Sequence, residues 1–316
     1  MYKTIFGPVN SRRLGFSLGI DLVTHKTCSF DCVYCECGKT TDLTVERKNW
    51  VSSETVKSEL NDFFLKNQNI KLNHLTFSGS GEPTLALNLG EIIIYLKEKF
   101  KYPVCVLTNS SLINNDDVIK DLLPADIVMP SLDAVTEKIY NAIDRPHKSI
   151  RIKNIINGLI KFRKQYKGQL FLEILFVKGI NDGEEELVKL SETADIIKPD
   201  KIFINTCIRP GTSKNIKYLT NEELNKIAGY FHLKTEIAYQ SANNNLKTYI
   251  DDTDCKLENV VAEIIKRRPS TLEDLKSATG FQNSTIEIFL KKLEETNPFL
   301  DIEIKNGYKF YFLKQK

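Results

Sequence analysis

Three cysteines near the N-terminus are spaced closely enough to bind one metal centre. Cys28, Cys32 and Cys35 follow the pattern C-x3-C-x2-C. A four-iron cluster, [4Fe–4S], is normally held by four thiolates, so three thiolates leave one iron atom open to a small chelating molecule. A zinc site is the alternative. Zinc usually needs four protein ligands, and no fourth cysteine or histidine has a suitable spacing. The pattern therefore favours an iron–sulfur cluster with one exchangeable position.

A glycine-rich segment, Ser78-Gly-Ser-Gly-Glu-Pro83, directly follows a predicted strand. Glycines such as Gly79 and Gly81 allow positive φ and a close approach of the main chain to a ligand. Pro83 cannot donate a hydrogen bond, and the free main-chain groups of such a turn can bind a charged group. Taken alone, such a segment is more often an ordinary connection between a strand and a helix.

Polar side chains follow several later strands of the same predicted sheet. In α/β barrels the loops after the strands build the site, so residues at these positions are candidates for ligand binding. They are Thr108, Asn109, Ser131, Asp133, Asn181 and Arg209. The alternatives are helix capping for the amide and hydroxyl side chains and a surface ion pair for Arg209. Glu173, inside an apolar strand, needs a partner if buried: a ligand, or a nearby arginine or lysine.

Short apolar runs alternate with amphipathic stretches from about residue 17 to residue 240, which predicts a parallel α/β fold. The predicted strands are Ser17–Leu22, His74–Ser78, Pro103–Thr108, Asp126–Leu132, Leu170–Val177 and Lys201–Asn205. The predicted helices are Ser52–Asn67, Leu87–Phe100, Asn115–Leu123, Val135–Ile143, Ile150–Tyr166, Gly183–Ile197 and Thr220–Phe231. Six such units are too few for an eight-stranded barrel, so we expect an open, partial (β/α)6 barrel.

The C-terminal part changes character. We predict domains at 1–240 and 256–316, joined by a polar linker at 241–255. Three helices, Leu257–Arg268, Thr271–Ala278 and Ser284–Glu295, precede two strands around Asn306-Gly307, which is a strong hairpin signal. This order is similar to a winged helix-turn-helix domain.

Composition limits the protein class without naming a function. The net charge is +3, too small to indicate a nucleic-acid partner by itself. The sequence shows no apolar run of membrane-spanning length and no secretion signal at its N-terminus. Seven cysteines, three of them clustered, favour metal binding in a reducing cytoplasm over disulfides.

Taken together, the motifs resemble those of radical S-adenosylmethionine (SAM) enzymes. Tyr34 directly precedes the third cysteine, and Gly79–Pro83 is similar to the GGEP element, with Ser80 at a glycine position. Segments over residues 1 to about 240 resemble the stand-alone branch grouped with wyosine-forming tRNA enzymes. These segments are Phe6–Gly15, Glu36–Thr41, Ser131–Ala134, Asp144–His147, Val177–Asp182 and Ile208–Gly211.

The resemblance implies a partial radical SAM barrel with a [4Fe–4S] cluster on Cys28, Cys32 and Cys35. It places SAM beside Gly79, Ser80, Gly81, Glu82 and Pro83. Further cofactor contacts are expected from one residue among the cysteines and from residues in or after the later strands. They are Tyr34, Thr108, Asn109, Ser131, Asp133, Glu173 and Asn181.

The implied reaction is reductive cleavage of SAM to a 5′-deoxyadenosyl radical, which takes a hydrogen atom from a substrate. The electron would come from a flavodoxin- or ferredoxin-like donor. The substrate class stays open among RNA, a peptide and a small anion, in an oxidoreductase or a transferase. Arg12, Arg13, Arg145 and Arg209 favour an anionic substrate, with solvated surface charge as the alternative.

Two observations narrow this interpretation. Wyosine-forming enzymes hold a second cluster on three upstream cysteines, and no cysteine precedes Cys28, so tricyclic-base formation is not expected. Cys37 and Cys207 show no ligand-like spacing, and a redox role for Cys37 stays open.

The competing hypothesis is an iron–sulfur sensor whose C-terminal domain binds nucleic acid or a protein partner. The predicted recognition helix carries Glu287 and has no clear basic face, which favours a protein-contact or substrate-presenting role for that domain over sequence-specific DNA binding.

Overall fold

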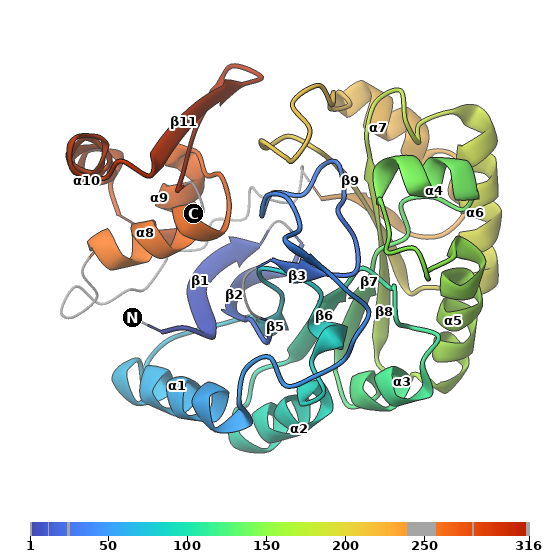
Figure 1. Ribbon diagram of the computed structural model, residues 1–316, viewed down its shortest axis with the longest axis horizontal. Coiled ribbons are helices and arrows are strands. Elements are labelled where there is room, and N and C mark those ends of the chain that lie inside the picture. Colours follow the sequence, from blue (N-terminus) through green and yellow to red (C-terminus); the bar gives the residue numbers. More distant parts are fainter. Residues whose placement is uncertain (1, 12, 24–25, 239–256, 280, 314–316) are drawn as a thin grey trace.

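The computed structural model describes residues 2–11, 13–23, 26–238, 257–279 and 281–313. Its centre is one sheet in the order β1-β2-β5-β6-β7-β8-β9-β10. All neighbouring strands run parallel except β1, which pairs antiparallel with β2. Among the strands described, β1 and β10 lie at the two edges of this order, so the sheet forms an open, partial barrel (Figure 1).

The six predicted strands are confirmed to within a few residues. They are β2 (Gly15–Ile20), β5 (His74–Phe77), β6 (Val104–Thr108), β7 (Ile127–Pro130), β8 (Gln169–Phe176) and β9 (Lys201–Thr206). Sequence patterns did not indicate the edge strands β1 (Ile5–Ser11) and β10 (Thr235–Ile237), or the two-residue pair β3 (Thr27–Cys28) and β4 (Asp42–Leu43). β1 contains Gly7-Pro8 and a register shift, which disturb its alternation, and β10 has only three residues.

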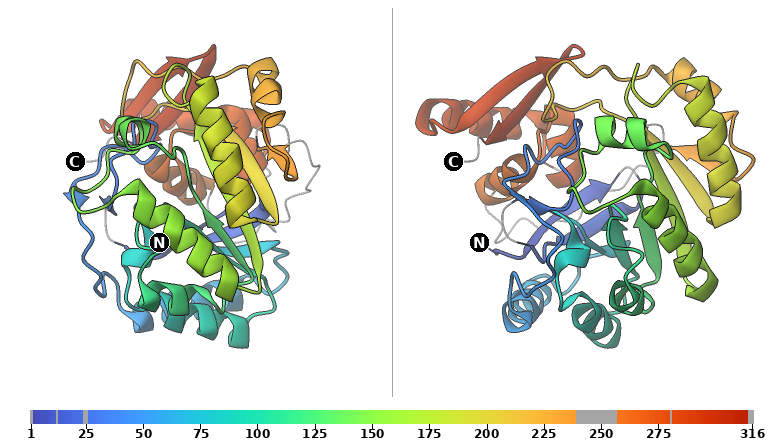
Figure 2. Two further views of the ribbon diagram at one scale, coloured as in Figure 1. Left: turned by 90° about the vertical axis from the view of Figure 1, so that its right-hand side faces the viewer. Right: turned by 45° about the vertical axis from the view of Figure 1, so that its right-hand side comes forward.

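The predicted helices cover the outer face of the sheet (Figures 1 and 2). They are α1 (Ser53–Lys66), α2 (Leu89–Lys99), α3 (Asp116–Leu122), α4 (Glu137–Ile143), α5 (Ile152–Gln165), α6 (Glu184–Ile197) and α7 (Asn221–Ala228). Apolar residues of the strands, such as Leu75, Val106 and Ile204, join buried helix residues in one large core. This burial is the main favourable contribution to the fold.

The inner face of the sheet is also filled. Alternate strand residues, among them Cys105, Met129 and Phe203, form a second small core that includes Leu14 from the turn between β1 and β2. Leu14 is 5% exposed. The N-terminal hairpin therefore inserts a side chain among the inner strand residues, so the barrel is a packed core and not a pore.

The C-terminal part contains the elements expected in the expected order: α8 (Leu257–Arg267), α9 (Leu272–Thr279), α10 (Asn283–Thr296), β11 (Leu300–Lys305) and β12 (Tyr308–Leu313). It has its own buried cluster, against which Val9 of β1 packs. α8 and α9 lie against β1, at the edge of the barrel (Figure 2). The predicted linker 241–255 lies outside the described residues, so the domain boundaries stay a prediction. No helix in the described parts of the chain has the length and apolar character needed to cross a bilayer.

The β11–β12 turn provides a test of the C-terminal fold. Asn306 and Gly307 both have positive φ, 54° and 79°. We expect Gly307→Ala to destabilise this domain by about 1 kcal/mol, because a Cβ disfavours that conformation. Hydrogen exchange of peptides from β11 and β12 should become faster. Gly183→Ala is the control, since Gly183 has φ −73° and open space around its Cα. Equal effects of both substitutions would contradict the turn.

Candidate functional site

Three segments meet at the carboxyl ends of β2, β5 and β6. One is the cluster loop (residues 28–41), which carries the three cysteines. The second is the glycine-rich loop (residues 78–83), whose Glu82 N–H donates to Thr27 O at 3.2 Å. The third follows β6, where Asn109 Nδ2 donates to Ser29 Oγ at 2.9 Å and lies 3.5 Å from Cys28 Sγ. The geometry thus brings together motifs that lie on separate loops in the sequence.

The cysteine thiols lie in a partly buried environment with one strong positive charge. Lys26, buried just before the loop, donates to Cys35 Sγ at 2.8 Å. The neighbouring Cys37 thiol and the charge of Lys26 lower the pKa of Cys35 to about 6, although burial opposes this. Burial raises the pKa of Cys28 to about 12 despite the charge of Lys26. Burial and the nearby Asp144 raise the pKa of Cys32 as well.

The thiols lie near one another without converging on a single point. Each of Cys28, Cys32 and Cys35 is a free thiol, and Cys28 and Cys35 are close enough to raise the pKa of Cys32 electrostatically. The described residues include no three His, Cys, Asp or Glu side chains placed to hold one metal ion. In an iron–sulfur cube, each thiolate binds a different iron atom, so a wider spacing is required. Three thiolates are a donor set of the kind that iron–sulfur clusters use.

The glycine-rich loop is held by close contacts. A Cβ on Gly81 would lie 1.7 Å from Thr27 O, and Gly79 has φ +148° beside Asp21. Ser80 donates through N and Oγ to Asp21 Oδ2 at 2.9 and 2.7 Å. Gly81 is therefore required where the glycine-rich loop passes Thr27, just before the cluster loop. Ser80 fixes the same loop by its hydrogen bonds to Asp21.

Glu82 and Thr108 bond to each other. Glu82 is 2% exposed and accepts from Thr108 Oγ1 at 2.6 Å and Asn109 N at 2.7 Å. Thr84 donates to the same carboxylate, at the start of the 3-10 turn Pro83–Leu85. Thr108 and Glu82 thus connect β6 to the glycine-rich loop, and their side chains are already engaged. Helix α3 is capped by Asn115, so Asn109 is not needed there.

Four of the expected cofactor residues line one small pocket beside Cys32: Tyr34, Asn109, Ser131 and Asp133. Tyr34 OH donates to Asp133 Oδ2. Asp144 lines the same pocket and accepts from the Cys32 thiol at 3.4 Å. Burial raises the pKa of Asp133 to about 7, and burial together with Asp133 raises the pKa of Asp144. Asp144 begins the segment Asp144–His147 that carries part of the family resemblance, but it was not named as a site residue because it ends α4 rather than a strand.

The other expected site residues lie apart from this pocket. Asn181 is fully buried and uses its amide to bond main-chain atoms of Asp133, Leu175 and Val177, so it supports the site from behind. Asp182 accepts from Gly179 N. Neither side chain caps α6, whose N-cap is Gly183, so the capping alternative is wrong.

Glu173 and the four arginines have different environments. Glu173 pairs with Arg13, and Asn205 Nδ2 donates to it at 3.3 Å, so its carboxylate has an arginine partner. Arg145 is partly exposed and donates to Ser213 Oγ at 3.1 Å. Arg209 is 3% exposed and pairs with two carboxylates, which contradicts a surface ion pair. Arg12 lies outside the described residues.

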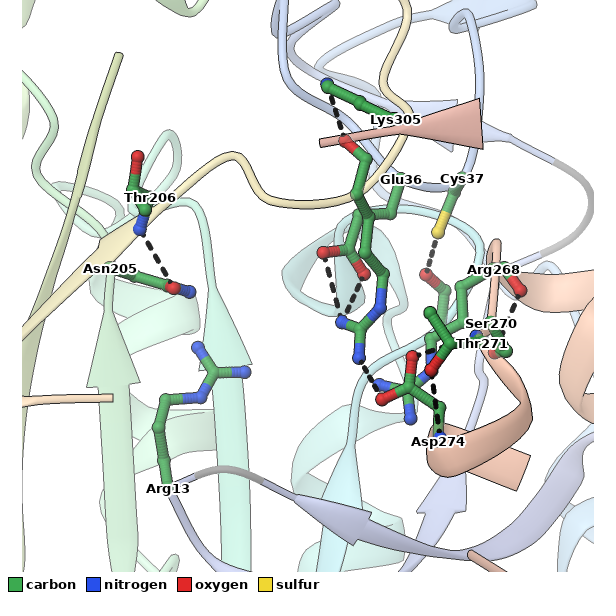
Figure 3. A network of polar contacts seen from close by, with 12 residues as sticks. Arg13, Glu36, Cys37, Asn205, Thr206, Arg268, Ser270, Thr271, Asp274 and Lys305 are labelled. Atoms are coloured by element: carbon green, nitrogen blue, oxygen red, sulfur yellow. Dashed lines mark hydrogen bonds and ion pairs between the residues drawn. The ribbon is translucent and has the colours of Figure 1, made fainter. Parts of the chain in front are cut away.

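Cys37 and Cys207 differ in position. Cys37 donates to Gly79 O at 3.3 Å and so joins the cluster loop to the glycine-rich loop (Figure 3). Cys207 is buried after β9 and donates to Lys217 O at 3.4 Å. Cys207 therefore belongs to the packing around the end of β9, whereas Cys37 lies at the candidate site.

Comparison with known proteins agrees with the geometry. The radical SAM superfamily profile matches residues 22–191. The chain is 37% identical over 293 residues to "UPF0026 protein MJ1312" of Methanocaldococcus jannaschii, covering 92% of this chain and 90% of that protein. It is also 37% identical over 311 residues to "GTPase Obg" of Brachyspira hyodysenteriae, covering 98% of this chain but only 45% of that relative.

A solved structure supports the fold alone. A radical SAM methyltransferase from Sphaerobacter thermophilus superposes with a TM-score of 0.53 at 14% identity, covering 70% of this chain and 65% of that one.

The charge of Lys26 can be tested in the reduced, cluster-free protein. Because a thiolate is the nucleophile, Cys35 should be alkylated readily at about pH 7, above its pKa of about 6, while Cys28 should react slowly. Lys26→Met should raise the pKa of Cys35 and slow its alkylation at that pH. Peptide mass spectrometry after iodoacetamide labelling measures both rates.

The control is Lys309→Met, which removes a lysine that pairs with Glu294 in the C-terminal domain. A Cys35 rate that still rises steeply well above about pH 7 in the unmodified protein would contradict the lowered pKa.

The profile match, the relatives and the convergence of the cysteine and glycine-rich loops lead to one assignment: the chain belongs to the radical SAM superfamily, together with the UPF0026 proteins, and is an enzyme of the radical SAM class.

Proposed function

We propose that this enzyme reductively cleaves SAM at a [4Fe–4S] cluster held by Cys28, Cys32 and Cys35. The observation that carries the proposal is the meeting of the three thiols with the glycine-rich loop and the pocket beside Cys32. When bound, the cluster supplies the electron that breaks SAM into methionine and a 5′-deoxyadenosyl radical. The organic chemistry belongs to the cofactor, and the protein supplies binding and orientation.

The residues of the cluster loop are suited to hold such a group. Thiolates are the iron ligands, and the ammonium of Lys26 offsets part of their negative charge. Although burial lowers it, the charges of Cys35, Cys37 and Cys28 raise the pKa of Lys26, so this lysine stays protonated. Asn109 offers an amide donor toward Cys28 Sγ. Hydrogen bonds to the sulfur ligands are one of the ways a protein tunes a cluster.

Side chains near the thiols offer groups of the kind that SAM needs. We assign Gly79–Pro83 to the methionyl end of SAM, because its glycines allow a ligand close to the main chain. Tyr34, Asn109, Ser131 and Asp133 line the adjacent pocket and offer hydroxyl, amide and carboxyl groups. Thr108, Glu82, Glu173 and Asn181 contribute by holding these groups in place, since their side chains are bonded within the protein.

The electron donor and the substrate are further parts of the proposal. A flavodoxin- or ferredoxin-like protein is the proposed donor, and a reducing cytoplasm agrees with the free thiols. Among the arginines predicted to favour an anionic substrate, Arg13 and Arg209 are paired internally. Arg145 is the more exposed group, at 46% of its side chain. The substrate classes considered are RNA, a peptide and a small anion.

Anaerobic reconstitution tests the reaction. We expect about four iron atoms per chain, and release of methionine and 5′-deoxyadenosine after reduction with dithionite in the presence of SAM. Cys32→Ala should abolish both the cluster colour and the cleavage. Cys207→Ala is the matched control, because this buried thiol follows β9 and donates to Lys217 O rather than belonging to the cluster loop.

An iron–sulfur sensor would give a different result. It would bind a cluster and leave SAM intact, and its C-terminal domain would bind nucleic acid or a protein partner. A stable cluster without any SAM cleavage would therefore overturn the enzymatic proposal in favour of this alternative.

A further inference from the structure

Two loops of the candidate site are linked to the C-terminal domain through charged side chains that lie between them. Arg209, which follows β9, donates from Nη1 to both carboxylate oxygens of Glu36 at 3.2 and 3.1 Å. Its Nη2 donates to Asp274 Oδ1 of α9 at 3.0 Å. Figure 3 shows Glu36 and Asp274 approaching this position from the cluster loop and from the C-terminal domain. Glu36 directly follows the cluster cysteine Cys35 in the sequence.

A second contact reaches the glycine-rich loop. Arg267 at the end of α8 donates to Asp21 Oδ2 at 3.1 Å. The same oxygen accepts both bonds from Ser80. Asp21 is 5% exposed, and the Arg267 guanidinium lies 4.4 Å from the ring centre of Phe6. The carboxylate that orients Ser80 is therefore itself oriented by the C-terminal domain.

The hairpin adds a third contact. Lys305 Nζ of β11 donates to Arg209 O at 2.9 Å (Figure 3), and Asn306 Nδ2 lies 3.4 Å from Ile208 O. Arg209 is thus held at its guanidinium by α9 and at its carbonyl by β11. Solvent-exposed ion pairs contribute little, but removing one partner of a buried pair leaves an uncompensated charge and is costly. Since Arg209 and Asp21 are almost fully buried, these contacts constrain geometry.

From these contacts we infer that the C-terminal domain is a structural part of the cofactor site, with Asp274 and Arg267 as positioning residues. Asp274 acts on the cluster loop through Arg209 and Glu36. Arg267 acts on the glycine-rich loop through Asp21 and Ser80. The inference rests on the proposed function for what the two loops bind. It assigns this domain a role in SAM binding rather than in DNA recognition. Groups that orient direct ligands in this way commonly affect affinity strongly.

Substitutions that preserve shape test the inference. Asp274→Asn removes the charge that Arg209 faces but keeps an oxygen for Thr271 N, which donates to Asp274 Oδ2 at 3.1 Å. Arg267→Met removes the guanidinium beside Asp21. Glu294→Gln is the control, because it breaks the partly exposed pair with Lys309 in the same domain. Asp274→Glu and Arg267→Lys test rescue by charge.

The first readout needs neither cluster nor SAM. In the full-length apoprotein, hydrogen exchange should become at least about threefold faster in the peptide containing Glu36 for Asp274→Asn, and in the peptide containing Ser80 for Arg267→Met. Exchange in α10 should stay as in the unmodified protein, which shows that the C-terminal domain remains folded. The control should behave like the unmodified protein.

The second readout uses the reconstituted protein. We expect Asp274→Asn and Arg267→Met to keep the cluster but to weaken SAM binding about tenfold, with a smaller SAM-induced change in the electron paramagnetic resonance spectrum of the reduced cluster. The conservative variants should recover part of the affinity. Unchanged exchange together with unchanged SAM affinity would overturn the inference. If the unmodified protein binds no SAM, the proposed function fails, and the exchange experiment alone decides whether the domain positions these loops.

Discussion

The arrangement of the site depends on one carboxylate that is removed from water. Glu82 accepts hydrogen bonds from Thr84, Thr108 and Asn109, and its N–H donates to Thr27 O. Burial raises the pKa of Glu82, while these hydrogen bonds lower it. A buried acceptor without partners costs about 1–3 kcal/mol, so the loops that supply its donors cannot separate freely. The ends of β5 and β6 are thereby held against the segment that begins the cluster loop.

Much of the barrel could be predicted because its strands are covered on both faces. Nearly continuous apolar runs such as Val104–Thr108 are typical of buried parallel strands when helices of suitable length lie between them. The edge strand β1 could not be recognised in the same way, since Gly7-Pro8 interrupts it and it is antiparallel. The three residues of β10 are too few for a periodic pattern. Predictions failed where local sequence carries little information and tertiary pairing decides.

In the site, too, residues marked by local sequence were predictable, whereas contacts between residues far apart in the sequence were not. Tyr34, Asn109, Ser131 and Asp133 were predictable because each lies beside a motif or a strand end, and the structure brings them to one pocket. Lys26 and Asp144 were missed, since their contacts with Cys35 and Cys32 are set by the path of the chain. The partners of Arg209 lie 173 and 65 residues away in the sequence, so no spacing argument could identify them.

The barrel and the C-terminal domain are joined by packing contacts as well as by the chain. Residues 241–255 are the predicted linker between them, and Val9 of β1 contacts the apolar cluster of α8, α9 and α10. Although burial raises it, the charges of Arg209 and Arg268 lower the pKa of Asp274 to about 2, so this carboxylate is ionised near neutral pH. Ionised groups are seldom buried unless they are paired. Because barrel residues supply the apolar contact and, through Arg209, part of the counter-charge, the C-terminal domain is stabilised by the barrel as well as by its own small core.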